Sequence, residues 1–157
     1  MTRLNIGAGR RHLNGYKTID IEEYNKPDIV GDFRTMTFSG IDEIRAEHIL
    51  EHFSREEGIE VLKQWCSWLK PSGILIVETP DLQRSCAYFT SMPDKINKHL
   101  YGSQEASWAF HKDGWWEDKF IYWLPQIGFT IMNISFPKYQ NGLPSIKVQA
   151  MKNEDSI

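Results

Sequence analysis

The segment Arg3-Leu4-Asn5-Ile6-Gly7-Ala8-Gly9 predicts a short strand that runs into a glycine turn. Because glycine has no side chain, such a turn lets the backbone approach a ligand closely. Three further strands are predicted at residues 17–21, 27–31 and 41–48, the last of which ends in a polar, His- and Glu-rich loop. The carboxyl ends of parallel strands meet at one edge of a sheet, and ligands bind at that edge.

A helix is predicted directly after this loop. Ser54 can cap its first turn, and Glu57 completes a capping box. Apolar residues then recur at helical spacing, at Ile59, Leu62, Trp65, Cys66 and Leu69. Residues 70–73 are expected to end the helix. The apolar run 74–77 is expected to be a strand buried on both faces, because its residues do not alternate with polar ones.

The pattern is weaker in the next part of the chain. Residues 81–113 contain scattered polar residues, and two loops are expected there. A helix is predicted from residue 116 to 127, with Pro125 cutting or distorting its end, because proline lacks the backbone N–H group.

The C-terminal segments predict an antiparallel hairpin. Its strands are expected at residues 128–134 and 145–151, with a turn at Asn141-Gly142. Residues 1–151 are therefore expected to form one domain, and residues 152–157 a frayed tail. The fold class is α/β, with a Rossmann-like, mostly parallel seven-stranded sheet that ends in the hairpin.

Composition limits the classes of function. The chain has 157 residues, enough to bury a core, and its net charge of -3 argues against a broad nucleic-acid-binding face. Cys66 and Cys86 belong to no CxxC pattern, which favours a reducing compartment. No apolar run approaches membrane-spanning length. A cytoplasmic protein without a membrane partner is expected.

Acidic residues follow the predicted strands. Asp20, at the end of the second strand, can accept hydrogen bonds from a ribose, and Asp32 with Phe33 can hold an adenine. A nicotinamide dinucleotide fits poorly, because His12 stands where a third glycine is needed and Asp20 follows Gly9 by only 11 residues. A ligand with ribose and adenine but no pyrophosphate suits these residues better.

Several motifs resemble one enzyme family. Leu4-Asn5-Ile6-Gly7-Ala8-Gly9 resembles the first motif of class I S-adenosylmethionine-dependent methyltransferases, and Asp20 matches the acid after their second strand. Residues 47–53 (EHILEHF) resemble the "hxLEHf" segment of the methyltransferase type 11 group, and residues 68–75 (WLKPSGIL) its "LKPGG" segment. The resemblance implies S-adenosyl-L-methionine as cofactor and methyl transfer to an oxygen or nitrogen atom of a small molecule.

A short form of the family is indicated. Tyr101-Gly102 and Phe110-His111-Lys112 resemble a subgroup linked to sugar or cell-envelope metabolism. Residues 10–17 are too few for the helix that usually follows the glycine turn, so this first helix is expected to be reduced or missing. Dimerisation over the gap, or loss of catalysis, would be consistent with that difference.

The predicted site residues follow from these motifs. Ten residues are expected to bind the cofactor: Asn5, Gly7, Ala8, Gly9, Asp20, Ile21, Asp32, Phe33, His48 and Leu50. His111 and His52 are the candidate general bases. No metal is expected. If residues 48–52 are helical, however, His48, Glu51 and His52 share one face and are candidate metal ligands, with His111 or Glu47 as a further one.

Two other classes of function stay open. One is a catalytically inactive binding module or partner subunit, and the other is a metal-dependent hydrolase built on His48, Glu51 and His52. Methylation of nucleic-acid bases is disfavoured because the chain lacks an N/D-P-P-Y/F tetrapeptide. A cluster of aromatic residues is predicted to line an acceptor pocket, the core or a homodimer face: Trp108, Phe110, Trp115, Trp116, Phe120, Tyr122 and Trp123.

Overall fold

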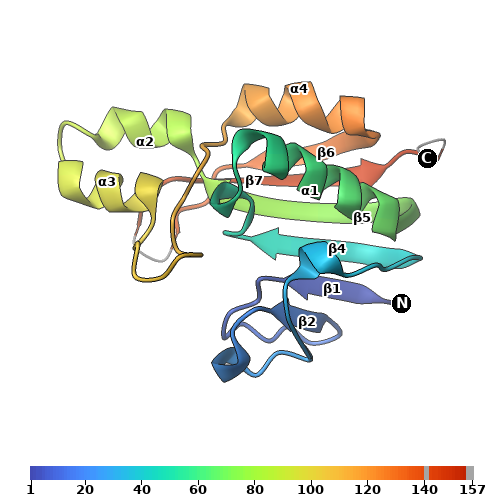
Figure 1. Ribbon diagram of the computed structural model, residues 1–157. Coiled ribbons are helices and arrows are strands. Elements are labelled where there is room, and N and C mark those ends of the chain that lie inside the picture. The colour runs from blue at the N-terminus through green and yellow to red at the C-terminus, as the bar shows by residue number, and fades with distance from the viewer. Residues whose placement is uncertain (140–141, 155–157) are drawn as a thin grey trace.

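One mixed sheet organises the molecule. The computed structural model describes residues 1–139 and 142–154. Within them, seven strands form a sheet in the order β3-β2-β1-β4-β5-β7-β6 (Figure 1). The strands are β1 (Arg3–Ile6), β2 (Lys17–Asp20), β3 (Ile29–Val30), β4 (Ile41–Glu47), β5 (Leu69–Pro80), β6 (Phe129–Ser135) and β7 (Ser145–Lys152).

The strand directions confirm the predicted fold class. Strands β3, β2, β1, β4 and β5 are parallel neighbours, and β7 pairs antiparallel with both β5 and β6. The expected C-terminal antiparallel pair is thus present. Asn141, part of the predicted turn between these strands, lies outside the described residues.

The helices lie on one side of the sheet and beyond its carboxyl edge. Helices α1 and α4 contact each other and the strands β5, β6 and β7. Helices α2 and α3 pack together beyond the carboxyl end of β5 (Figure 1). The α-helices are α1 (Arg55–Trp68), α2 (Leu82–Tyr88), α3 (Pro93–Tyr101) and α4 (Glu117–Ile127), and the 3-10 turns are η1 (Glu23–Asn25), η2 (Phe33–Thr35) and η3 (Leu50–His52).

The first helix of the usual fold is missing, as the short spacing predicted. Residues 1–54, all of which the structure describes, contain no α-helix. Residues 7–16 instead form turns. Arg11 N donates to Ala8 O at 2.9 Å, and Tyr16 N donates to Leu13 O at 3.1 Å.

The two faces of the sheet differ in chemistry. Strand register aligns apolar residues in rows on the covered face, beneath α1 and α4, and these residues are buried: Leu4, Ile6, Ile44, Ala46, Leu75, Val77, Val148 and Ala150. The alternate positions form the polar face: Asn5, Glu43, Arg45, Glu47, Ile76, Glu78, Lys147 and Gln149. The expectation that residues 74–77 are buried on both faces is therefore wrong, because Ile74 and Ile76 are only half-buried.

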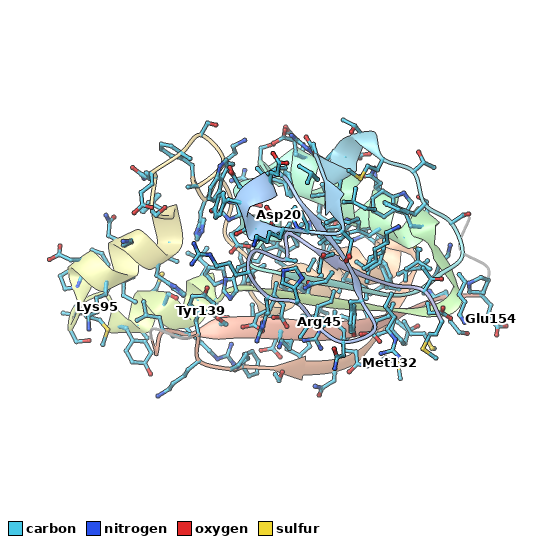
Figure 2. The ribbon with its side chains drawn as sticks, turned by 90° about the horizontal axis from the view of Figure 1, so that it is seen from below. Asp20, Arg45, Lys95, Met132, Tyr139 and Glu154 are labelled. Carbon is cyan, nitrogen blue, oxygen red and sulfur yellow. The ribbon has the colours of Figure 1, made fainter. Side chains whose placement is uncertain are left out.

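Charged contacts bring residues 10–16 onto the polar face. The Arg11 guanidinium pairs with Glu47, and the Tyr16 hydroxyl donates to Glu43. The guanidinium of Arg45, which is labelled in Figure 2, lies 5.9 Å from the centre of the Tyr16 ring. The short connection therefore attaches to β4 through polar groups where the family resemblance implies a helix.

Helix α1 confirms its predicted start. Ser54 Oγ accepts from Glu57 N at 3.4 Å, and the Glu57 carboxylate accepts from Ser54 N at 2.9 Å, which completes the capping box. The helix ends at Trp68, slightly earlier than expected, because β5 already begins at Leu69. Ser72, with a φ of 60°, turns the chain inside the expected stop at 70–73.

Other expectations for the C-terminal half need correction. The weakly patterned segment 81–113 contains helices α2 and α3 as well as loops. Pro125 does not cut α4, which continues to Ile127. The proline lies in the last turn and cannot donate a hydrogen bond to the carbonyl of Ile121, but Ile121 is exposed to solvent, so water can bind that carbonyl. Strand β7 includes Lys152, whose Nζ donates to Leu69 O at 3.0 Å, and residues 155–157 of the expected tail lie outside the described residues.

In the described part of the chain, none of the helices has the length and apolarity needed to cross a membrane. Cys66 is buried, Cys86 is exposed, and both are free thiols. These cysteines therefore contribute no covalent cross-link to the described fold.

Candidate functional site

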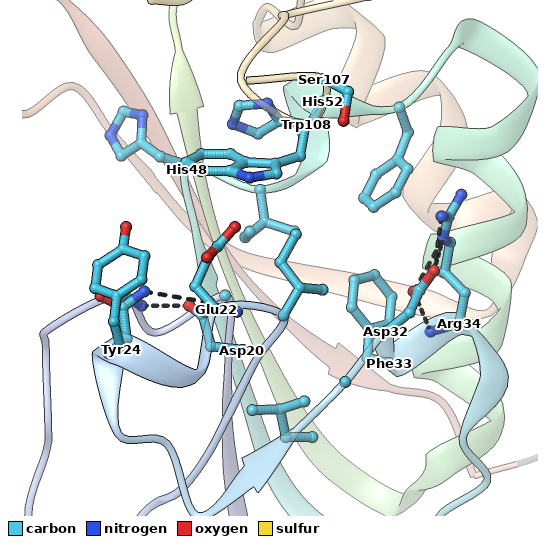
Figure 3. A pocket seen from close by; sticks show the side chains of 18 of the residues that line it. Asp20, Glu22, Tyr24, Asp32, Phe33, Arg34, His48, His52, Ser107 and Trp108 are labelled. Carbon is cyan, nitrogen blue, oxygen red and sulfur yellow. Dashed lines mark hydrogen bonds and ion pairs between the residues drawn. The ribbon is translucent and has the colours of Figure 1, made fainter. Parts of the chain in front are cut away.

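A cavity of about 590 Å³ opens at the carboxyl edge of the sheet, beside the ends of β1, β2 and β4 (Figure 3). This volume is in the range of small-molecule and cofactor sites. Seven of the ten predicted cofactor residues line it: Gly7, Gly9, Asp20, Ile21, Asp32, Phe33 and His48. The candidate base His52 also lines this cavity.

Gly7 allows the close turn after β1. Its φ is +63°, a conformation that favours glycine, and its N–H donates to Ile19 O at 2.8 Å. A Cβ atom at this position would lie 1.9 Å from Cδ1 of Ile49, which also lines the cavity. Glycine is therefore required both for the backbone conformation and for the shape of the cavity floor.

Asp20 organises the glycine turn. Its Oδ2 accepts from Gly9 N at 2.7 Å, and its Oδ1 accepts from Glu22 N at 2.8 Å and from Asn25 Nδ2 at 3.2 Å. A carboxylate has about four acceptor positions, so roughly one remains for a ligand. The loop around Asp20 is further fixed by His12, whose Nε2 donates to Asn25 O at 3.1 Å.

Glu22 lines the same cavity two residues further on. Figure 3 shows its side chain reaching into the cavity, with Trp108 on the opposite side. Within the described residues its carboxylate accepts no hydrogen bond, so both oxygens are available to a ligand. The sequence analysis did not identify Glu22, although its place just after the acidic end of β2 was a signal for it.

Asp32, Phe33 and Arg34 form the wall after β3. Asp32 Oδ2 accepts from the Arg34 side chain at 2.7 Å, and this hydrogen bond lowers the pKa of the Asp32 carboxyl. The Phe33 ring packs edge-on against Phe53, with 5.7 Å between ring centres. Asp28, the acidic residue just before β3, instead accepts from Thr18 N and Oγ1 at 2.7 and 2.8 Å, and it does not line the cavity.

His48 directly follows β4 and has an unusual backbone conformation. Its φ of 57° is left-handed, which is uncommon for a residue with a Cβ atom and is frequent at functional sites. Its N–H donates to Glu78 O at 2.7 Å. This turn places the imidazole between two buried carboxylates, those of Glu51 and Glu78.

The imidazole of His48 carries a positive charge at neutral pH. Burial lowers its pKa, but its Nδ1 hydrogen bond to Glu51 Oε1 (3.2 Å) and the Glu78 carboxylate 3.5 Å from Nε2 outweigh burial and raise that pKa to about 9. Burial raises the pKa of Glu78, yet His48 and Lys147 together lower it to about 2. The site therefore holds a fixed imidazolium between two carboxylates.

A second cavity of about 740 Å³ adjoins the first and shares His48, His52 and Trp108 with it. His111 and Glu51 line only this second cavity. His52 Nδ1 donates to Phe110 O at 3.1 Å, and the His52 and His111 rings are perpendicular, with centres 4.8 Å apart. The two candidate bases thus lie together, although 59 positions separate them in the sequence.

Three predicted cofactor residues do not line the cavity. Asn5 is buried, and its Nδ2 donates to Arg11 O at 2.9 Å. Ala8 is buried and donates its N–H to Ile19 O at 3.3 Å, and Leu50 is fully buried in the core. These residues shape the turns around the cavity. The lining residues that the sequence analysis did not assign to the cofactor site include Arg10, Tyr24, Arg34, Ile49, Trp108 and Lys112.

Residues 48–52 are not a regular helix. Only Leu50–His52 form a turn, of the 3-10 type, and His48 precedes it in its left-handed conformation. The condition under which His48, Glu51 and His52 would share a helical face is therefore not met. Glu51, His52 and His111 instead offer ligand atoms that all lie within 4.8 Å of one another.

Comparison with known proteins finds similar structures but no similar sequence family. No protein-family model and no curated protein sequence matches the chain. Solved structures, in contrast, match over nearly its whole length.

Three examples show the extent of this structural similarity. An S-adenosylmethionine-dependent methyltransferase from Archaeoglobus fulgidus is 18% identical, with 96% of this chain and 86% of that chain aligned at a TM-score of 0.67. One from Methanosarcina mazei is 15% identical, covering 97% and 92% at 0.69. Magnesium protoporphyrin IX methyltransferase from Synechocystis, with bound S-adenosylhomocysteine, is 14% identical, covering 96% and 74% at 0.71. The chain therefore has the fold of class I S-adenosylmethionine-dependent methyltransferases.

Proposed function

We propose that the protein is an S-adenosylmethionine-dependent methyltransferase that methylates an oxygen or nitrogen atom of a small molecule. The observation that carries this proposal is the convergence of the glycine turn, Asp20, Asp32 and His48 on one cavity of cofactor size. The three solved structures described above are methyltransferases, and one of these three holds S-adenosylhomocysteine.

In this proposal the cofactor extends across the first cavity. Gly7 and Gly9 lie along its methionine part, where a side chain would obstruct it. Asp20 and Glu22 accept from the ribose hydroxyls, because Asp20 alone has about one acceptor position free. Ile21 and Phe33 contact the adenine, and Asp32 accepts from its amino group. His48 closes the methionine end, next to the second cavity.

The acceptor is proposed to occupy the second cavity. A new bond forms from the acceptor atom to the methyl carbon while the carbon–sulfur bond breaks, and sulfur keeps the electron pair as S-adenosylhomocysteine leaves. Alignment of nucleophile, methyl group and sulfur supplies most of the rate in such a transfer. Burial lowers the pKa of His111, which favours the neutral imidazole that can take the acceptor's proton. His52 is the second residue proposed for this role.

Two further parts of this proposal concern the chemical class of the acceptor and the location of the protein in the cell. A sugar or cell-envelope metabolite as acceptor, and a cytoplasmic location, rest on the sequence motifs and the absence of paired cysteines in the sequence pattern. A screen of sugar-linked acceptors with radiolabelled S-adenosylmethionine would test the acceptor class directly.

Calorimetric titration with S-adenosylmethionine and S-adenosylhomocysteine tests the cofactor site. Micromolar binding, about -8 kcal/mol, is expected for the unaltered chain. Asp20→Ala should abolish it, because the glycine turn loses its anchor. Glu22→Gln should weaken it about tenfold, the effect of one lost charge-assisted hydrogen bond.

Glu23→Gln is the matched control, since Glu23 neighbours Glu22 but is exposed and does not line the cavity. Its affinity should equal that of the unaltered chain. Absence of heat and of any thermal shift at millimolar ligand would refute the methyltransferase proposal and favour the binding module that the missing first helix suggests.

A further inference from the structure

A compact group of metal-ligand side chains lies where the two cavities meet. Glu51 and His52 come from η3, and His111 comes from the loop after α3. One ligand atom from each lies within 4.8 Å of the others. All three residues line the second cavity, which is the proposed acceptor site.

Glu51 is a buried carboxylate with an oxygen that lacks a partner. The residue is 2% exposed, and its Oε1 accepts from His48 Nδ1 at 3.2 Å. Within the described residues its Oε2 is buried and receives no hydrogen bond. Leaving a buried acceptor unpaired costs about 1–3 kcal/mol, and more for a charged group. A cation at this position would offset that cost.

The backbone contact of His52 leaves its other ring nitrogen available to a metal ion. The carbonyl oxygen of Phe110 can only accept, so His52 Nδ1 carries the proton and its Nε2 keeps a free lone pair. Such a carbonyl contact commonly fixes the tautomer of a metal-binding histidine.

A simple hydrogen-bonded cluster explains the geometry less well. His111 Nε2 lies 4.0 Å from Glu51 Oε1, which is beyond hydrogen-bond distance. Two ligands held about 2.1 Å from a tetrahedral ion are about 3.4 Å apart. Because the three ligand atoms lie within 4.8 Å of one another, side-chain rotations that bring each pair about 0.6 to 1.4 Å closer would close the site around an ion.

We propose that Glu51, His52 and His111 bind a divalent transition-metal ion with an open coordination position facing the second cavity. Two imidazoles and one carboxylate suit zinc and its neighbours better than magnesium or calcium, which prefer all-oxygen sites. Three protein ligands leave a position for an oxygen of the acceptor. That use of the ion rests on the proposed methyltransferase function, whereas binding of the ion does not.

The proposal changes the role of the two histidines. As metal ligands, His52 and His111 would hold and polarise the acceptor through the ion and would not act as general bases. His48 becomes a positioning residue, because its hydrogen bond orients the Glu51 carboxylate.

Titration of the metal-free full chain with Co²⁺ tests the site by visible d–d absorption, and elemental analysis with Zn²⁺ gives the stoichiometry. One equivalent is expected. His111→Ala and His52→Ala should each weaken binding at least tenfold. Glu51→Gln should do the same, and it retains a hydrogen-bond acceptor for His48. Glu56→Gln is the matched control for Glu51→Gln, because Glu56 is exposed and lines neither cavity.

S-adenosylhomocysteine titration of each variant shows whether it is folded and separates the two proposals. No metal binding by a chain that binds S-adenosylhomocysteine would overturn the metal site alone. Equal Co²⁺ affinity of the unaltered chain and His111→Ala would overturn it too. Metal binding without any nucleoside binding would refute the methyltransferase function and leave the site standing.

Discussion

The two faces of the sheet are built on different principles. The covered face carries rows of fully buried aliphatic residues beneath α1 and α4, with Trp65 and Phe120 completely enclosed. The polar face carries a network in which Glu47 pairs with Arg11, Arg45 and Lys147. Hydrophobic burial stabilises the first face, and ion pairs of modest individual value cover the second.

This difference explains how the chain manages without the first helix. An apolar sheet face left without a helix would expose a large hydrophobic patch. Alternation of polar and apolar residues along β4 and β7 avoids that patch, since a strand with one solvated face alternates in this way. The short connection 10–16 then needs only a few polar contacts to hold the glycine turn at the cavity.

A substitution pair on β5 would test the contrast most strongly. Leu75 and Ile76 are neighbours with isomeric side chains on opposite faces; Leu75 is 1% exposed, and Ile76 is half-buried. Leu75→Ala should lower the free energy of unfolding by about 3–5 kcal/mol, because it leaves a cavity in the core. Ile76→Ala should lose less than half as much.

Urea unfolding with matched m-values measures both losses. Equal losses would show that the polar face is buried in solution, as a homodimer formed across the missing helix would require. Sedimentation of the unaltered chain would then identify such a dimer.

Glu47→Gln should have the next largest effect. Three cations surround this side chain, with Nζ of Lys147 at 3.0 Å from Oε1 and a guanidinium nitrogen of Arg45 at 2.9 Å from it. Removing the charge should lower the free energy of unfolding by about 2 kcal/mol. The loss should shrink in high salt, because salt screens partly exposed charges.

The same substitution should weaken S-adenosylhomocysteine binding, since Arg11 ties the glycine turn to Glu47. Asp42→Asn is the control: it removes the Lys70 ion pair near the other end of β4 and should leave ligand affinity unchanged. Similar affinity losses in both variants would show that ion pairs on this face act only through global stability.

Ser54→Ala probes the helix that covers the apolar face. Ser54→Ala should lower the free energy of unfolding by about 1 kcal/mol because it removes the cap, whereas Ser54→Gly should lower it by only about a few tenths of a kcal/mol. Thermal unfolding of both variants measures the difference. Identical stability of Ser54→Ala and the unaltered chain would mean that packing alone fixes the start of α1.

Local signals in the sequence were sufficient for most of the fold. Strand positions, the capping box of α1, the missing first helix and the antiparallel C-terminal pair all follow from short-range patterns. The one-sided burial of residues 74–77 was not predictable, because an aliphatic run does not reveal that a polar face lies beside Ile74 and Ile76. Helices α2 and α3 lack strong periodicity, so their existence was missed.

The positions of site residues could be predicted from the sequence where a residue follows the end of a strand. They could not be predicted where a residue lies in a long loop. Gly7, Asp20, Asp32 and His48 each lie at or just after the end of a strand, and all four line the cavity. Trp108 reaches it from a loop whose path depends on tertiary contacts such as Gln104 N to Ala109 O. The approach of His111 to Glu51 and His52 has the same origin.

The smallest expected effect on stability concerns Asp28, near the β3 edge of the sheet, where polar contacts hold the chain. Hydrogen bonds from Thr18 N and Oγ1 lower the pKa of the Asp28 carboxyl below its ordinary value of 3.8. Because the pKa is depressed in the folded state, these hydrogen bonds stabilise the fold fully at pH values above the ordinary pKa. This stability is lost as the pH falls through the folded-state pKa.

Asp28→Asn should therefore be slightly less stable than the unaltered chain at pH 7, and the two should converge under acidic conditions. Urea midpoints at neutral pH and near pH 3 measure this convergence. Glu105→Gln, at an exposed loop position, controls for the general effect of removing one negative charge. If the difference at pH 7 persisted unchanged in acid, the contribution of Asp28 would come from the shape of its side chain, since the asparagine keeps an acceptor oxygen but no charge.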